Sequence, residues 1–156
     1  MPRVVFAAAG LMLTASLVSC GGGGKPTSTT TPLGRPSGSI IGHTWQVATI
    51  NNGTAVVGVI DGTSLTARFG DDGHVSGSAG CNHYSATYTL DGSALHVGPA
   101  IATRKHCESP AGVMQQESEF LHALEQSRTV EAGESLVALR DARNTIQLTL
   151  NHPEPP

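Results

Sequence analysis

The sequence predicts a small, mainly β fold (α+β): a twisted antiparallel sheet or partly closed barrel with one packed helix. Three observations lead to this prediction. Short runs alternate apolar and polar residues, Asn-Gly and Asp-Gly pairs separate these runs, and one segment shows helical spacing. Alternation with a period of two is typical of half-buried antiparallel strands. Without the N-terminal segments described below, about 115 residues remain, which is enough for a single core.

Strands are predicted where alternation and β-branched residues coincide. Asn-Gly and Asp-Gly pairs favour tight turns between them, because Asn, Asp and Gly tolerate positive φ. These pairs begin at Asn52, Asp61, Asp72 and Asp91. The predicted strands cover residues 44–50, 55–60, 65–69, 84–90, 94–98, 127–132, 135–140 and 146–150.

One segment has the spacing of a helix instead. Ser109 and Pro110 precede it, and Ser at the N-cap with Pro in the first turn favours a helix start. Apolar spacing of three, four and seven predicts a helix of about 14 residues that packs one stripe against the sheet. The residues at this spacing are Val113, Met114, Glu117, Phe120, Leu121 and Leu124, and all of them except Glu117 are apolar.

The N-terminus has the organisation of an export signal. An apolar run over residues 4–18 is too short for the roughly 20-residue helix that spans a bilayer. The run ends in Leu-Val-Ser-Cys, which resembles the lipobox of bacterial lipoprotein signal peptides. The resemblance implies cleavage between Ser19 and Cys20, and a diacylglyceryl group on Cys20, with palmitate among the acyl chains. The alternatives are an ordinary secretory signal with an incidental cysteine, or a retained membrane anchor.

This interpretation divides the chain into three parts. Residues 1–19 form the signal peptide, residues 20–40 the lipidated cysteine and a flexible tether rich in Gly, Ser, Thr and Pro, and residues 41–152 the folded domain. We expect a cell-membrane protein that is lipid-anchored on the extracytoplasmic side, because two or three acyl chains anchor durably.

Cys81 and Cys107 remain after Cys20 is assigned to the lipid. An even pair in an oxidising compartment predicts a disulfide, and two unpaired buried thiols are the alternative. The bridge would close a loop of about 27 residues and stabilise the fold by roughly 3 kcal/mol. It would also hold the helix entrance near Gly80.

Two motifs resemble a known family. Residues 77–88 contain a Gly-Cys-Asn motif, and Thr103 precedes Cys107 by four positions. Together they resemble the META domain, the HslJ-like family. The resemblance implies a small β-rich fold with a helix, frequent location in the envelope and associations with stress response, but no settled enzymatic activity. The remaining matches are Trp45, Glu117, Phe120 and Leu124.

The Gly-Cys-Asn region has a structural and a functional interpretation. Gly77 and Gly80 permit a bulge or a close backbone approach. Asn82 can make a local side-chain hydrogen bond at an irregular strand position. The alternative is a binding surface formed by Asn82, His83 and Tyr84.

Composition and motifs argue against several functions. Charged residues make up 13% of the chain, the formal net charge is −3, and no basic cluster exists beyond Arg104-Lys105, so nucleic acid is not an expected partner. No Gly-x-Ser-x-Gly motif is present, and no catalytic residue or cofactor is predicted. Glu117, Glu119 and Glu125 are assigned to a solvated or capping face of the helix.

Seven histidines raise the question of a metal. None forms His-x-x-x-His on a helix or His-Glu-x-x-His, so no metal site is expected. They are His43, His74, His83, His96, His106, His122 and His152.

The leading expectation is therefore a monomeric, non-enzymatic envelope lipoprotein. It would serve stress tolerance by binding an envelope protein or a small ligand. The alternatives are a small extracytoplasmic hydrolase and a metal or small-ligand carrier that uses the scattered histidines.

Overall fold

The structure is a computed structural model that describes residues 39–133 and 135–152. The predicted export signal, Cys20 and most of the predicted tether lie outside the described residues. Ile40, which the sequence analysis assigned to the tether, is buried in the core. Its carbonyl oxygen accepts a hydrogen bond of 3.0 Å from the indole Nε1 of Trp45. The folded domain therefore begins before residue 41.

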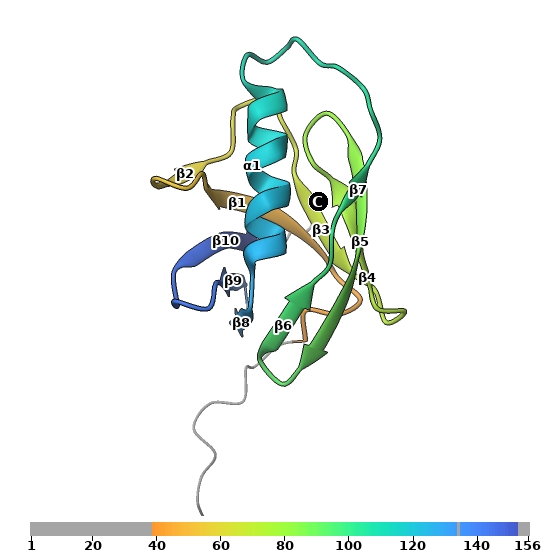
Figure 1. Cartoon of the computed structure of the whole chain (residues 1–156), viewed down its shortest axis with the longest axis vertical. Helices are drawn as coiled ribbons and strands as arrows, with labels where there is room; N and C mark the ends of the chain where they lie inside the picture. Colours follow the sequence, from red (N-terminus) through yellow and green to blue (C-terminus); the bar gives the residue numbers. More distant parts are fainter. Residues whose placement is uncertain (1–38, 134, 153–156) are drawn as a thin grey trace, which may run out of the picture. The chain divides into compact units, whose positions relative to one another are not determined.

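Strands dominate this domain, and one helix packs against them (Figure 1). All strand pairs are antiparallel. The elements are β1 (Thr44–Asn51), β2 (Val56–Gly58), β3 (Thr66–Phe69), β4 (His74–Ser78), β5 (His83–Asp91), β6 (Ala94–Val97), β7 (Ile101–Ala102), α1 (Val113–Gln126), β8 (Thr129–Ala132), β9 (Leu136–Arg140) and β10 (Ile146–Asn151).

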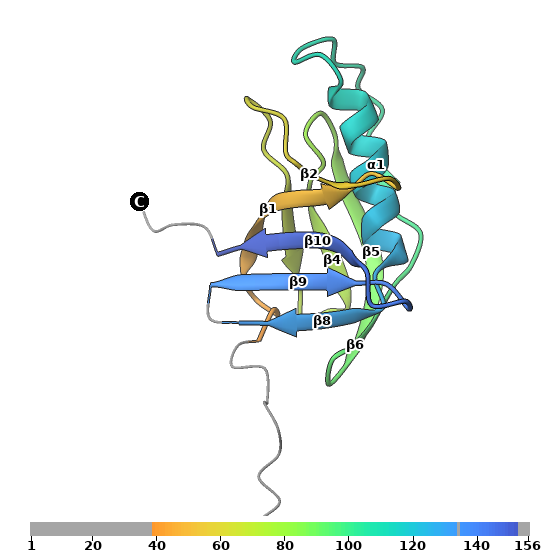
Figure 2. The same cartoon turned by 90° about the vertical axis from the view of Figure 1, so that its left-hand side faces the viewer.

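The sheet closes into a barrel because β1 pairs with β3 on one edge and with β10 on the other. Its strand order is β1-β10-β9-β8-β6-β5-β4-β3 and back to β1. Figure 2 shows β1, β10, β9 and β8 side by side in one wall. β2 and β7 lie outside this ring, since β2 pairs with β1 and β7 with β5. The predicted mainly β fold with one packed helix is confirmed, and its barrel is closed.

All eight predicted strands are present, and their ends differ from the predictions by at most two residues. β4 and β7 were missed. β4 reads His-Val-Ser-Gly-Ser, and Val75 is its one buried apolar side chain, so its alternation is weak. β7 has two residues, and Ile101 is 78% exposed. Backbone pairing with the nine-residue β5, rather than side-chain burial, defines both strands.

The predicted helix exists and has 14 residues, but its predicted start was wrong. The N-cap is Gly112, in the left-handed region with φ of 86°, and no side chain caps the helix. Ser109 and Pro110 lie in a preceding turn, because the Val113 N–H donates to the Pro110 carbonyl oxygen at 3.2 Å. Glycine suits this N-cap position because it reaches positive φ without steric cost.

Helix α1 lies across one end of the barrel, near β1, β10 and β6 (Figure 2). Phe120 reaches the core, where its ring meets that of Tyr84 edge to face at 5.3 Å. Of the predicted stripe, Met114 and Leu121 are only half-buried. The buried helix residues are Val113, Gln116, Glu117, Phe120, Ala123 and Leu124.

The two glycines of the Gly-Cys-Asn region act as predicted. A Cβ on Gly77 would overlap with the backbone carbonyl of Thr66, so the two strands approach closely there. Gly80 has φ of 107°, which L side chains rarely adopt. Gly77 thus permits the close approach of β4 to β3, and Gly80 lies in the corner between β4 and β5.

Candidate functional site

The corner between β4 and β5 contains a buried amide that joins three segments. The side chain of Asn82 is 2% exposed. Its Oδ1 accepts hydrogen bonds of 2.7 Å from both the Thr103 hydroxyl and the Lys105 N–H. Its Nδ2 donates to the Lys105 carbonyl oxygen at 3.1 Å. These partners are more than 20 residues away, so the predicted local hydrogen bond was wrong and the amide instead holds a distant loop.

The third segment is helix α1. The carboxylate of Glu117 accepts hydrogen bonds of 2.8 Å from both the backbone N–H and the Nδ2 of Asn82. Glu117 is 7% exposed, so its assignment to a solvated or capping helix face was wrong. A buried carboxylate is tolerated where donors satisfy it. We call this set of contacts, made by Asn82, Thr103, Lys105 and Glu117, the Asn82 hub.

A disulfide lies beside the Asn82 hub. Cys81 and Cys107 are bonded, with an S–S distance of 2.00 Å and Cα atoms 5.9 Å apart. Cys107 also connects to the helix, since its N–H donates to the thioether of Met114 at 3.4 Å. The pair therefore holds the loop before α1 against the β4–β5 corner, as the cysteine count predicted.

The three residues of the predicted binding surface do not lie on one surface. Asn82 and Tyr84 are buried, and only His83 is exposed. The Tyr84 hydroxyl donates to the Thr66 carbonyl oxygen at 3.0 Å, and burial raises the pKa of this phenol above its ordinary value. Asn82 and Tyr84 of the Gly-Cys-Asn region therefore make contacts that stabilise the fold.

The histidines do not gather into a metal-binding group. Among the described residues, no group of three or more His, Cys, Asp or Glu side chains is placed to hold an ion. The rings of His43 and His152 lie 5.4 Å apart, and both lie close to Trp45.

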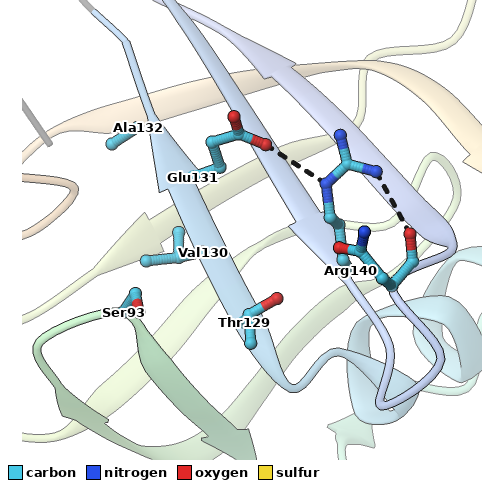
Figure 3. A pocket seen from close by; sticks show the side chains of 7 residues that line it. Ser93, Thr129, Val130, Glu131, Ala132 and Arg140 are labelled. Carbon is cyan, nitrogen blue, oxygen red and sulfur yellow. Dashed lines mark hydrogen bonds and ion pairs between the residues drawn. The ribbon is translucent and has the colours of Figure 1, made fainter. Parts of the chain in front are cut away.

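Three of the surface pockets that the described residues form, each of about 300 Å³, are candidates. Two of them are lined mostly by polar residues. One lies on β8, where that strand diverges from β6 after the single pair Ala94–Thr129. Figure 3 shows Glu131 and Arg140 reaching toward each other there. The Arg140 Nε donates a hydrogen bond of 3.2 Å to the Glu131 carboxylate. Arg140 also donates to the Asn144 carbonyl oxygen, so its guanidinium is already engaged within the protein.

The second polar pocket lies beside the β9–β10 turn and is lined by His122, Asp141 and Arg143 among others. The N–H groups of Thr145 and Arg143 each donate to the Asp141 carboxylate at 2.9 Å. These bonds, that of Thr145 above all, hold the pKa of Asp141 below its ordinary value. Asp141 is therefore committed to the turn as an acceptor, and is unsuited to proton transfer near neutral pH.

The third pocket is a groove between β2 and the first half of α1, and it is mainly apolar. We call it the β2–α1 groove. Among the residues that line the three pockets, no Ser or Thr hydroxyl forms a hydrogen bond with a histidine. The β2–α1 groove is lined by Ile50, Val57, Gly58, Ile60, Gly112, Gln115, Gln116 and Glu119.

Gln116 holds the two walls of the groove together. Its Oε1 accepts a hydrogen bond of 2.6 Å from the Ile60 N–H, and its Nε2 donates to the Thr63 hydroxyl at 3.0 Å. The sequence analysis did not single out Gln116. No local signal identifies its partners, which are more than 50 positions away.

The META domain family matches residues 38–153. The chain belongs to the META domain family. A search of curated proteins found no match. In the described ranges, no helix has the length and apolar character that a membrane crossing requires.

Solved structures of other proteins share the META domain fold seen here. A protein from Burkholderia xenovorans, determined by NMR, is 23% identical and has a TM-score of 0.61, covering 74% of this chain and 85% of that one. A DUF4847 family protein from Bacteroides vulgatus, determined by crystallography, is 12% identical with a TM-score of 0.54, covering 75% and 96%. At these identities the likeness establishes the fold alone.

We expect Asn82→Asp to destabilise the domain by about 3–5 kcal/mol, because it places a second carboxylate against buried Glu117. Adding Glu117→Gln should recover about 1–2 kcal/mol, because the side-chain amide of Gln at position 117 can donate to the Asp carboxylate at position 82. Urea unfolding measures both values. Asn144→Asp, at an exposed turn, is the control and should change stability by less than about 0.5 kcal/mol. Equal losses at 82 and 144, or no recovery in the double variant, would contradict the role of the hub.

Proposed function

We propose that this META domain protein is a non-enzymatic binding module, anchored by lipid on the extracytoplasmic side of the cell membrane. The observation that carries the proposal is the β2–α1 groove. It is apolar, it is built from two walls fixed by Gln116, and its lining has one ionisable side chain, Glu119. Ligand sites are typically concave and apolar with few polar groups, whereas acid–base catalysis needs positioned titratable groups.

The anchor is supported by sequence alone. The Leu-Val-Ser-Cys motif that ends at Cys20 supplies the lipidated cysteine, and residues 21–38 supply a tether of small and polar residues. Such a tether would hold the domain away from the lipid surface while leaving its grooves accessible. We include a role in stress tolerance because the family resemblance implies one.

Ser19→Leu tests the anchor. A bulky residue before Cys20 should block signal cleavage, so the full-length precursor should accumulate. The measurement is the mass of the protein from the native host, together with its partition between the detergent and aqueous phases. Unaltered protein should be cleaved and enter the detergent phase. An unaltered mature protein that stays in the aqueous phase would contradict lipid anchoring.

A photoreactive p-benzoylphenylalanine at the position of Gln115, on the exposed rim of the groove, tests the binding role in intact cells. Illumination should give a discrete adduct, and Val57→Gln should lower its yield because it makes the lining of the groove polar. The same photoreactive residue at Asp91, in the exposed β5–β6 turn, is the control. Adducts of equal intensity at both positions, unaffected by Val57→Gln, would count against the groove.

A further inference from the structure

We propose that the β2–α1 groove binds an extended peptide segment of another protein, which adds as a strand to the free edge of β2. This inference rests on the proposed binding function and specifies its ligand. The segment would carry apolar side chains at alternate positions and a Lys or Arg opposite Glu119. Extended peptides bind other proteins in this way, with main-chain hydrogen bonds for affinity and side-chain pockets for specificity.

The hydrogen-bond pattern of β2 leaves one edge open. β2 pairs with β1 alone among the described strands. The Asn52 N–H donates to Ala55, and the Val59 N–H to Ala48, so alternate residues from Ala55 onward direct their backbone groups toward β1. Since directions alternate along a strand, Val56 and Gly58 direct their N–H and C=O groups away from β1. An unpaired row of this kind is a template for a further strand.

The open edge borders the apolar groove. Gly58 both presents outward backbone groups and lines the groove. Val57 points to the face it shares with its cross-strand partner Ile50, which forms part of the groove lining. An added strand would therefore place every second side chain over this floor, because side chains alternate between the two faces. Val56 lies on the opposite face and is 46% exposed.

The groove is formed before any ligand arrives. Gln116, which is 4% exposed, bonds both Ile60 and Thr63 and so holds the β2–β3 connection against the helix. A preformed site loses less entropy on binding than one that must be ordered.

Charge selects the chemistry of the partner segment. Glu119 is the single ionisable residue of the groove lining, and Gln115 donates to its Oε1 at 2.9 Å. The whole chain has a formal net charge of −3. A segment with one or two basic residues among apolar ones is therefore complementary, whereas an acidic segment is repelled.

Displayed random eight-residue peptides, selected on the full chain in detergent, test the proposal. Selected peptides should alternate apolar residues, lack Pro at the centre and contain Lys or Arg. N-methylation of single amides in a selected peptide removes one donor at a time. Binding should fall about tenfold or more at every second position and change less than about twofold between them. If the loss of affinity does not alternate from one N-methylated position to the next, strand addition is overturned.

Matched substitutions in β2 test the free edge of the strand and the floor of the groove separately, and a further substitution serves as the control. Val56→Pro removes an outward N–H without touching the ladder to β1, and should weaken peptide binding about tenfold with the melting temperature preserved. Val57→Gln should weaken peptide binding to a similar extent, because it makes the floor of the groove polar. Val56→Gln changes the far face and should have less than about a threefold effect. Glu119→Lys should invert the preference from basic to acidic peptides.

The remaining outcomes are also decisive. Peptides that bind equally well to Val56→Pro would overturn strand addition, as would a second copy of this chain occupying β2, seen as Val56→Pro-sensitive dimers. If photocrosslinking at Gln115 gives an adduct in cells but the peptide selection gives no peptide that binds as a strand, this inference is overturned and the proposed binding function stands. Failure of both experiments would overturn both proposals.

Discussion

The arrangement of this domain depends on one buried contact, between Asn82 and the carboxylate of Glu117. The contact joins the β4–β5 corner to the helix, and the other face of the Asn82 amide holds the loop around Lys105. A buried amide and a buried carboxylate are each costly when unpaired, and each satisfies the other here. The Cys81–Cys107 bridge lies next to this contact, so a covalent bond and a polar hub constrain the same place.

The hub also determines where the groove can form. Gln116 and Glu117 are neighbours in α1, and they reach in different directions. Glu117 fixes the helix to the β4–β5 corner, while Gln116 fixes the β2–β3 connection to the helix. The wall that α1 contributes to the β2–α1 groove is thus positioned by a residue that does not line it. A change in the hub should therefore reach the groove through the orientation of the helix.

The sequence predicted those features that local patterns encode. Alternation located eight strands, apolar spacing located the helix, and the cysteine count located the bridge. Features that depend on distant partners were missed. The Glu117 carboxylate was assigned to a solvated face, because nothing near it in the sequence indicates Asn82, 35 positions away. Similarly, β2 was predicted as a strand, but its position at a sheet edge beside α1 follows from the topology of the closed barrel.

Native-state hydrogen exchange at the Asn82 backbone amide tests the central role of the hub most directly. This N–H donates to the buried Glu117 carboxylate, so it should exchange only when the whole domain unfolds. Its opening free energy should then equal the unfolding free energy from urea denaturation of the same sample. An Asn82 amide that opens at a much lower free energy, while core strand amides stay protected, would show that the fold persists without this contact.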